Sequence, residues 1–387
     1  MANILHINAS YKPAYVYGGP TISVSNLCEE LAKSNTVEVY TTTANGKSEL
    51  SVETGVKLLM DGVAVTFFSR LSKDHTHFSP ALILHYIQNI RKFDIIHVHA
   101  WWNTVSVLCL ILGVLLGKTL IFSPRGTLSP YSFKSKNDFI KRLIFNIGKP
   151  FLNRCHFHVT SELEEQHTLK LLNPKSIHII PNLIRLPEQQ GEMEQGLIPG
   201  QEEKLEPFKL FFISRIDEKK GIELLFSSLR YVNYNWQLTI AGNGKKEYVD
   251  KLLQLSKEYK IDKHIKWIGF LDNQVKFKAM KEHDLLVLPS FDENFANIVI
   301  ECLSTGTPVL LSENVGLSKF VVQHHVGWAF KRTEAELTEH LNKIPDLRQE
   351  LMEIRKRSPE VISNIFKPDI VIKDYLKMYF SDSGSLS

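Results

Sequence analysis

The chain has 387 residues, of which 43% are hydrophobic and 23% are charged, and its formal net charge is +4. This composition is that of a folded globular protein and excludes a largely disordered one, and the length suits two domains of roughly 150–200 residues. The four cysteines are scattered and form no metal-binding pair with each other or with His, which favours reduced thiols in a cytoplasmic protein.

Apolar runs and helical patterns alternate along the first half of the chain. Residues 1–10 lack the basic start of a signal peptide, and residues 18–34 carry apolar side chains on one face of a predicted helix. Residues 105–122 are strongly apolar, but Lys118 interrupts them short of about 20 residues, so they predict a buried helix and a strand rather than a membrane span. The other predicted strands are 3–9, 36–43, 93–100, 119–126, 155–159 and 176–182.

The composition changes near residue 185, where Pro, Gly, Gln and Glu become frequent and periodicity is lost. We interpret 186–207 as a linker between an N-terminal domain, 1–185, and a second domain, 208–365. Residues 366–387 are expected to form a helix that crosses back to the first domain, followed by a disordered tail. The strands predicted in the second domain are 208–216, 236–244, 264–271, 284–290 and 307–312.

Alternating strands and helices in both halves predict an α/β fold of two doubly wound, Rossmann-like domains facing each other across a cleft. Ligands of such sheets bind beyond the carboxyl ends of the strands, so the cleft is the expected site. The sequence has no HExxH, GxSxG or P-loop, and no Asp-x-Asp suited to a metal-bound nucleotide sugar. We therefore expect no metal.

Residues 118–154 carry eight Lys or Arg side chains against a single Asp, interleaved with large apolar residues. This pattern is typical either of a solvated basic helix face or of a patch for anionic lipid headgroups or a phosphorylated lipid substrate. No nucleic-acid-binding motif accompanies it, so nucleic acid is not an expected partner.

Two glutamates lie eight positions apart in the segment PSFDENFANIVIECLSTGTPVLLS. Glu301 stands inside an apolar run, where an unpaired charge is unfavourable. We expect a helix to begin near 295–297 and to end at Gly306, with Glu293 in the loop before it. Free N–H groups at this helix start favour an anionic ligand. The spacing alone also allows Glu293 to cap the helix and Glu301 to pair with a buried Lys or Arg.

Two further segments suit phosphate groups. Arg215, Lys219 and Lys220 follow a predicted strand, and cations at the carboxyl end of a strand suit a diphosphate, although solvated surface bases are the alternative. Gly18 and Gly19 precede a helix after the first strand, where glycine lets backbone N–H groups approach a phosphate; an ordinary turn is the alternative.

Polar residues also end two strands of the first half. His97 and His99 alternate with apolar residues and so lie on one face of the sheet, where a hydrogen-bonded core histidine is the expected role of at least one. Arg125 lies between Pro124 and Gly126 at the end of the next strand, where we expect it to project into the cleft.

The order and spacing of these segments resemble the retaining nucleotide-sugar glycosyltransferases of family 4, which have the two-domain GT-B fold. The resemblance covers nearly the whole chain and is closest to a bacterial surface-polysaccharide type with a SPRG motif in the first domain. It is carried by the segments GGP, FDIIHVHA, SPRGTL, IIPN, SRIDEKKG, AGNG, WIGFL and the Glu-x7-Glu pair.

The resemblance implies roles for the matched residues. Arg215 and Lys220 would bind the donor diphosphate, Glu301 would bind the ribose hydroxyls, and Glu293 would lie by the donor sugar. The implied donor-binding set is Gly18, Gly19, Arg215, Lys220, Gly269, Phe270, Leu271, Glu293, Phe295, Ala296, Asn297 and Glu301. The implied catalytic residues are Glu293, Arg125, Lys220 and Arg215, and those on the acceptor side are His99, Trp101 and Arg125.

Three positions depart from the family pattern. Ala296 stands where many members have Gly, Arg125 where many have His, and Leu183 where Gly usually follows the IPN segment. A bacterial subgroup carries PRG at the second of these places. The match is therefore closer in the second domain than in the first.

The implied activity is retaining, metal-independent transfer of a sugar from a nucleoside-diphosphate-sugar to a glycan or a polyprenyl-diphosphate-linked acceptor, with no cofactor. We expect it at the inner face of the plasma membrane, in contact with the anionic surface, in bacterial O-antigen, capsule or exopolysaccharide synthesis. The alternatives are a nucleotide-sugar epimerase of the same fold and a non-catalytic nucleotide-sugar-binding subunit. A dinucleotide-dependent oxidoreductase is disfavoured because no GxGxxG with a downstream acid is present.

Overall fold

The computed structural model of the protein describes residues 1–133, 138–186 and 206–380. It divides the chain into two compact units, Met1–Arg185 with Phe366–Ser387, and Leu186–Ile365. Nearly all of the predicted linker, the predicted disordered tail, and Lys134 and Lys136 of the basic segment lie outside the described residues. Within the described ranges, no helix is long and apolar enough to cross a membrane.

The first unit is built on an eight-stranded sheet with the order β10-β9-β8-β7-β1-β2-β6-β5. It is parallel except for β5, which pairs antiparallel with β6 at the edge. His6 on β1 lies opposite His97 on β7 in the ladder, so the two imidazoles meet in the middle of the sheet. The strands are β1 (Asn3–Ile7), β2 (Thr36–Thr42), β5 (Lys57–Met60), β6 (Val63–Phe68), β7 (Ile95–His99), β8 (Leu120–Ser123), β9 (His156–Val159) and β10 (Ser176–Ile179), with a small hairpin of β3 (Ala44–Asn45) and β4 (Ser48–Glu49).

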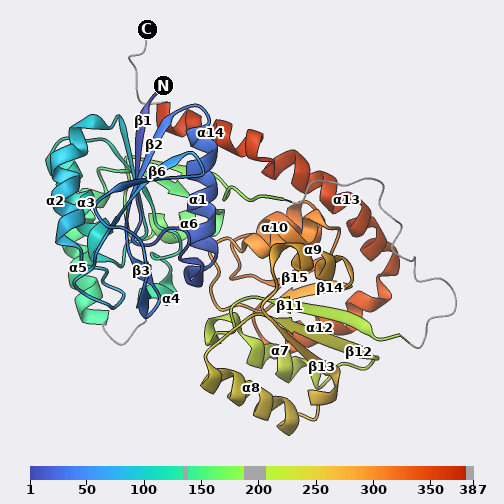
Figure 1. Ribbon diagram of the computed structural model, residues 1–387. Coiled ribbons are helices and arrows are strands. Elements are labelled where there is room, and N and C mark those ends of the chain that lie inside the picture. The colour runs from blue at the N-terminus through green and yellow to red at the C-terminus, as the bar shows by residue number, and fades with distance from the viewer. Residues whose placement is uncertain (134–137, 187–205, 381–387) are drawn as a thin grey trace. The chain divides into compact units, whose positions relative to one another are not determined.

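Helices cover both faces of this sheet, which explains why its central strands are almost continuously apolar (Figure 1). Leu5 and Ile7 of β1 pack with α2, α3 and α5, whereas Ile4 packs with α1 and α14. Alternation along the strand therefore turns His6 toward the α1 and α14 face. The helices of this unit are α1 (Gly19–Ala32), α2 (Pro80–Asn89), α3 (Thr104–Leu115), α4 (Pro130–Phe133), α5 (Asp138–Leu152), α6 (Glu162–Leu169) and α14 (Pro368–Phe380), with the 3-10 helices η1 (Tyr15–Tyr17) and η2 (Ile90–Lys92).

The second unit has a fully parallel six-stranded sheet with the order β13-β12-β11-β14-β15-β16. The order reverses between β11 and β14, and at such a point the loops after the two strands diverge and leave room for a ligand. Its strands are β11 (Phe208–Ile213), β12 (Trp236–Ala241), β13 (Ile265–Gly269), β14 (Leu285–Leu288), β15 (Val309–Ser312) and β16 (Gly327–Phe330). Its helices are α7 (Ile222–Leu229), α8 (Lys246–Glu258), α9 (Asn273–Lys281), α10 (Asn297–Ser304), α11 (Ser318–Gln323), α12 (Glu334–Lys343) and α13 (Arg348–Phe366), with η3 (Glu218–Lys220), η4 (Asp262–His264) and η5 (Ile344–Asp346).

Most of the predicted elements are present. The apolar run 105–122 forms α3 and then β8, as expected, and the helix predicted to begin near 295–297 is α10. Gly306 lies just past the end of α10 with φ 87°, in the left-handed conformation typical of a helix end. The edge pair β5 and β6 was not predicted; the side chains of β5 are all at least partly exposed, whereas those of β6 are mostly buried.

Candidate functional site

In the second unit, the loop after β11 and the loop after β14 lie against each other at the carboxyl edge of the sheet. The N–H of Phe291 donates to the carbonyl of Lys219 over 2.8 Å. Gly221 has φ 72°, and a Cβ placed there would lie 2.3 Å from the carbonyl oxygen of Pro289. Glycine is therefore required at this position for the two loops to approach, and their approach brings the predicted cations to the predicted carboxylates.

Two lysine–carboxylate pairs join these loops. Lys220 donates to Glu293, and Lys219 lies 2.7 Å from Asp292. Burial opposes ionisation of Glu293, but Lys220, and then Lys219 and Arg215, together hold the pKa of this carboxyl below its ordinary value. Glu293 is therefore a carboxylate at neutral pH. Arg215 is exposed beside it, so the predicted residues Arg215, Lys220 and Glu293 do come together.

The backbone around Glu293 is held from a third loop. Its N–H donates to Asn314 over 3.1 Å, and its carbonyl accepts from the N–H of Gly316 over 2.8 Å. Three residues later, Ala296 adopts φ 69° and ψ 73° immediately before α10 begins at Asn297. A left-handed alanine is unfavourable by about 1–2 kcal/mol, so the surrounding loop must hold it in place. The positive end of α10 thus follows directly after the Lys220–Glu293 pair.

Glu301 lies on α10 outside the face that packs into the core. It pairs with Lys276 of α9 over 2.9 Å, and the side chains of Lys276 and Glu301 are 14% and 15% exposed. The structure therefore shows the alternative allowed by the sequence, in which Glu301 pairs with a mostly buried lysine. A polar ligand that reached Glu301 would share it with Lys276 or displace that lysine.

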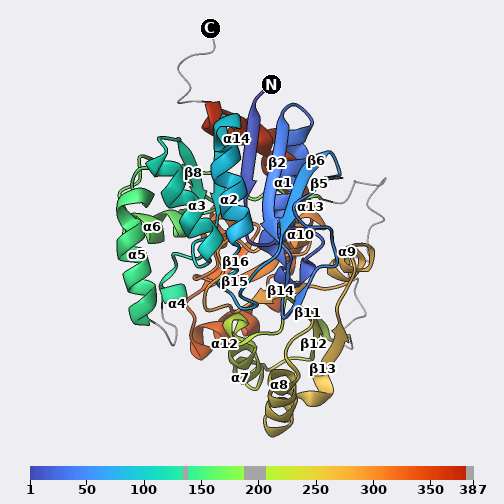
Figure 2. The ribbon, with the colours of Figure 1, turned by 60° about the vertical axis from the view of Figure 1, so that its left-hand side comes forward.

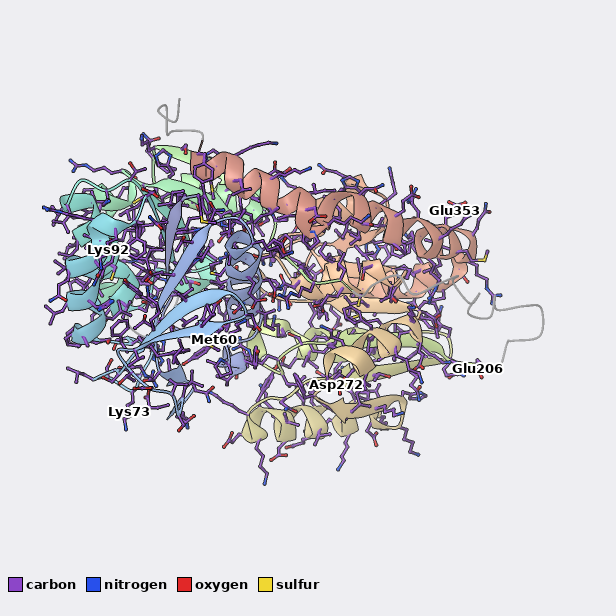
Figure 3. The ribbon with its side chains drawn as sticks, turned by 45° about the horizontal axis from the view of Figure 1, so that its top comes forward. Met60, Lys73, Lys92, Glu206, Asp272 and Glu353 are labelled. Atoms are coloured by element: carbon purple, nitrogen blue, oxygen red, sulfur yellow. The ribbon has the colours of Figure 1, made fainter. Side chains whose placement is uncertain are left out.

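The loop predicted to face a base follows β13 and leads into α9. Gly269 has φ 70°, and its carbonyl accepts from the N–H of Gly242 over 2.7 Å. Phe270 is strongly exposed, and Asp272, which is labelled in Figure 3, accepts the N–H of Val275 at the start of α9. This loop leads within a few residues to Lys276, the lysine that pairs with Glu301.

Two basic residues at this site were not predicted from the sequence. Lys276 was not identified at all, and Arg332 lies with its guanidinium carbon 3.0 Å from the centre of the Phe291 ring and its Nε 3.3 Å from the carbonyl of Pro289. Both come from segments with no motif, Lys276 from α9 and Arg332 from the loop after β16. Their position beside the site is decided by the sheet topology.

In the first unit, Gly18 ends η1 and caps α1 with φ 70° and ψ −137°. This region of backbone space is accessible essentially to glycine, so the residue is needed for the sharp entry into the helix. Gly19 is the first residue of α1, and Pro20 follows it in the first turn, where a missing N–H is tolerated.

A chain of buried histidines and tyrosines lies between the first sheet and α14. The Nδ1 and Nε2 atoms of His97 lie 2.8 Å from the hydroxyl of Tyr379 and 2.6 Å from that of Ser123. Ser123 also lies 2.6 Å from His158, whose other nitrogen is 3.0 Å from the Tyr375 hydroxyl. These contacts tie the C-terminal helix to β7, β8 and β9.

His6 and His99 form a second part of this network, with His6 Nδ1 and His99 Nε2 2.9 Å apart. Burial, and then the charge of Arg125, lower the pKa of His6 to about 3 and hold the pKa of His99 well below its ordinary value. The same two causes act on the pKa of His158. The histidines are therefore neutral at physiological pH.

Arg125 adopts φ 54°, directly before Gly126 with φ 78°. Its Nη1 donates to the side chain of Asn182, and its Nε and Nη2 are shielded from solvent. The guanidinium is thus turned into the first unit, contrary to the expectation of a side chain projecting from the sheet edge. Glu164, which was not predicted, stabilises this turn by accepting the N–H of Gly126 over 2.7 Å.

Solved structures with a similar fold cover almost the whole chain. A sucrose-phosphate synthase from Thermosynechococcus elongatus matches with a TM-score of 0.75 and 17% identity, covering 98% of this chain and 99% of that one. HepE from Anabaena, in complex with UDP and glucose, matches with a TM-score of 0.74 and 16% identity, covering 98% and 100%. Identities this low establish the fold alone.

Two family matches divide the sequence in the same way as the two units. Residues 17–186 match the family described as Glycosyltransferase Family 4, and residues 195–361 match Glycosyl transferases group 1. Between them they span most of the chain. The chain belongs to the GT-B glycosyltransferases.

Curated relatives of this GT-B chain fall into two groups by coverage. An uncharacterized glycosyltransferase of Methanocaldococcus jannaschii is 30% identical over 129 residues, which are 32% of each chain. A lipopolysaccharide 1,6-galactosyltransferase of Salmonella typhimurium is 24% identical over 162 residues, covering 41% of this chain and 42% of its own length. This chain thus aligns with less than half the length of these two. An uncharacterized 41.2 kDa protein in the cps region of Klebsiella pneumoniae is 20% identical over 394 residues, covering 98% and 99%.

Two residues expected on the acceptor side of this GT-B chain are buried. Trp101 has no exposed surface and packs edge-on against Phe122, and a Cβ added at Gly148 would lie 2.3 Å from its ring. His99 is 1% exposed and belongs to the histidine network. Side chains enclosed in this way cannot touch an acceptor, so we correct both assignments: Trp101 is a core residue and His99 a buried polar one.

The donor atoms of His6, His97 and His99 lie within 4.8 Å of one another and form the one group in the described parts of the chain that is close enough to hold a metal ion. Both ring nitrogens of His97 are nevertheless occupied by Tyr379 and Ser123. The positive charge of Arg125 also disfavours a cation here. The arrangement therefore suits a buried hydrogen-bond network better than a metal site in this glycosyltransferase.

Proposed function

We propose that the protein is a retaining, metal-independent glycosyltransferase that moves a sugar from a nucleoside-diphosphate-sugar to a glycan or lipid-diphosphate-linked acceptor. The observation that carries the proposal is the meeting of Arg215, Lys220 and Glu293 directly before the N-terminus of α10. Cations and a helix N-terminus are what a departing diphosphate needs, and the carboxylate supplies a polar partner for sugar hydroxyls. Family membership of both units supports the same assignment.

In the proposed reaction the diphosphate of the donor lies against Arg215, Lys220 and the start of α10. Lys220 then exchanges its contact with Glu293 for a phosphate oxygen, which frees the carboxylate to accept from the donor sugar. Negative charge on the diphosphate grows as the glycosidic bond breaks, and these positive groups, fixed in advance, stabilise it. The leaving phosphate takes the proton of the acceptor hydroxyl, which attacks from the same face, so the anomeric configuration is retained.

The remaining donor contacts are proposed from the family resemblance of the matched residues. Glu301 accepts from the ribose hydroxyls, the loop Gly269–Leu271 faces the base, and backbone N–H groups of Phe295, Ala296 and Asn297 hold the sugar and phosphate. Gly18 and Gly19 stay proposed donor-binding residues on the family resemblance. We assign Arg125 no contact with donor or acceptor, because its guanidinium donates to Asn182 and its Nε and Nη2 are shielded from solvent.

The two neighbouring ion pairs provide a matched test. Lys220→Ala removes the proposed diphosphate contact, and we expect transfer from the selected donor to fall about 10²–10³-fold. Lys219→Ala removes the adjacent pair with Asp292 and only a weaker influence on Glu293, and should lower the rate far less than Lys220→Ala does. Transfer is measured as label that moves from the nucleotide sugar into lipid-extractable acceptor. Equal losses in the two variants, or none in either, would remove the assignment.

The donor is selected first by a thermal-shift screen with UDP-, GDP- and ADP-sugars, because a specific ligand raises the melting temperature by mass action. UDP-sugars lead the screen because HepE was solved with UDP and glucose. NMR of the first product formed then tests retention, and activity abolished by a chelator would contradict metal independence. Conversion of the donor with no acceptor present would instead support an epimerase.

The proposed setting is bacterial surface polysaccharide synthesis at the inner face of the plasma membrane. Its support is the full-length alignment with a protein of the Klebsiella cps region and the partial alignment with a lipopolysaccharide galactosyltransferase. A deletion strain tests it: loss of the native surface polysaccharide is expected, and an unchanged polysaccharide profile would contradict this setting.

A further inference from the structure

Helix α5 turns a continuous row of large apolar side chains to solvent. Phe139 is 79% exposed, Ile140 55%, Leu143 51%, Ile144 37% and Ile147 57%. At about 100° per residue, these five side chains fall within a sector about 140° wide on one side of the helix. In a helix of a globular domain such a row normally faces the core, and an exposed one indicates an interaction surface.

The opposite side of α5 is fixed to the first unit and cannot turn the apolar row inward. Phe145 and Leu152 are buried in the core that α5 shares with α3. Gly148 lies so close to Trp101 that an added Cβ would be 2.3 Å from the ring. The helix is therefore held in one rotation, at the outer edge of the helix layer (Figures 1 and 2).

The charged residues along the edge of the apolar row are mainly basic. Arg142 and Lys149 are exposed and lie on the helix between the apolar sector and the buried one, and Arg154 follows just after the helix. Asp138, the first residue of α5, is the one acidic residue among residues 138–154. Lys141 contributes less, since it is half-buried, donates to the carbonyl of Ser132 and lies over the ring of Trp102.

We propose that α5 docks the first unit onto an anionic lipid surface, lying in the plane of the interface. The apolar row enters the headgroup region, and Arg142, Lys149 and Arg154 remain beside the phosphates. Long basic side chains suit this place because their stems follow apolar surface while their charges stay in water. A protein partner would more often offer charges of both signs in similar number, and the predominantly basic edge complements an anionic lipid surface. The purpose of this docking, access to a lipid-linked acceptor, rests on the proposed function.

The test is sedimentation of the full-length protein with vesicles of phosphatidylcholine alone and with about 30% phosphatidylglycerol, in the absence of donor. The double variant Phe139→Ser with Ile147→Ser should lose binding to the anionic vesicles by about tenfold or more. The matched control, Leu59→Ser with Leu71→Ser, removes two side chains that are 78% and 73% exposed elsewhere in the same unit and should bind as the wild type does. Arg142→Gln with Lys149→Gln should weaken binding to the anionic vesicles and make the remaining binding less sensitive to salt.

Three results would overturn the proposal. The first is no sedimentation of the wild type with anionic vesicles, and the second is equal loss in the test and control variants. The third is a wild-type dimer that the Phe139 and Ile147 variant makes monomeric, since a second copy would then cover the row. Vesicle binding without any sugar transfer would contradict the proposed function and leave the docking surface intact. Sugar transfer without vesicle binding would contradict the docking surface and leave the proposed function intact.

Discussion

Single residues of the candidate donor site are arranged as paired opposite charges. Lys220 with Glu293 and Lys276 with Glu301 each place a lysine where a nucleotide sugar would offer phosphate or hydroxyl groups. Ion pairs in a site keep mostly buried charges compensated while no ligand is bound. In the proposed reaction, donor binding would exchange these ion-pair partners for donor groups, and a variant that removes one partner should alter recognition of one part of the donor.

The ribose assignment of Glu301 can be tested by comparing a nucleoside diphosphate with its 2′-deoxy form. The wild type should bind the ribose form about tenfold or more tightly, because a hydrogen bond to a carboxylate contributes about 1.5–3 kcal/mol. Glu301→Gln should lower the ratio of the two dissociation constants, because a neutral amide oxygen accepts a weaker hydrogen bond than a carboxylate does. Lys276→Met, which keeps the carboxylate, should retain the preference. Isothermal titration measures both, and an unchanged ratio in Glu301→Gln would leave Glu301 as a structural partner of Lys276.

Ala296 provides a second test at the residue scale, because its φ of 69° is unfavourable for any residue with a Cβ. Ala296→Gly relieves the backbone strain of the folded state but also increases the conformational freedom of the unfolded chain. We therefore expect its free energy of unfolding to exceed that of the wild type by less than about 1 kcal/mol. Ala296→Val adds a branched side chain and should destabilise by about 2 kcal/mol or more. Urea unfolding measures both, and a Val variant as stable as the Gly variant would contradict the left-handed backbone.

At the scale of elements, the sequence pattern identified what is determined locally. The helix α10 and the pair α3 and β8 were predicted because each combines an apolar pattern with a clear end, Gly306 in one case and Lys118 in the other. The rotation of α5 was not predicted, since its sequence carries two apolar faces and only packing selects the one formed by Phe145 and Leu152.

The packing of α5 can be tested at Gly148. Alanine is normally the better helix former by about 1 kcal/mol, but here its methyl group would overlap the Trp101 ring. We expect Gly148→Ala to lower the free energy of unfolding by about 1–3 kcal/mol. Asn146→Ala on the exposed side of the same helix should instead be neutral or slightly stabilising. Equal effects in the two variants, measured by urea unfolding, would show that α5 does not press on Trp101.

At the scale of the whole molecule, four buried histidines make stability depend on pH. His6, His97, His99 and His158 have a pKa lowered from 6.5 in the folded state, that of His6 to about 3, chiefly by burial. The unfolded chain binds protons at these sites below about pH 6.5 and the folded chain does not, so stability is complete above that pH and is lost as the pH falls. Each histidine contributes a slope of about 1.4 kcal/mol per pH unit.

We therefore expect the free energy of unfolding to fall steeply between pH 6.5 and 5, before carboxylates such as Glu293 titrate. Urea unfolding at half-unit steps from pH 5 to 8 measures it. His6→Asn removes one titrating group and should reduce the slope by about 1.4 kcal/mol per pH unit. A stability that is the same at pH 5.5 and 7.5 would contradict the buried neutral network.

The sequence by itself determined the α/β class with two Rossmann-like halves, the ends of α10, and the identity of Arg215, Lys220, Glu293 and Glu301 as candidates, because strand and helix periods and loop composition are local properties. Tertiary structure alone decided that Lys220 meets Glu293, that Lys276 meets Glu301, that Trp101 and His99 are enclosed, and that Arg125 turns inward. These depend on which strands lie side by side and which helix face is covered. Residues far apart in the chain set both, and no local pattern encodes them.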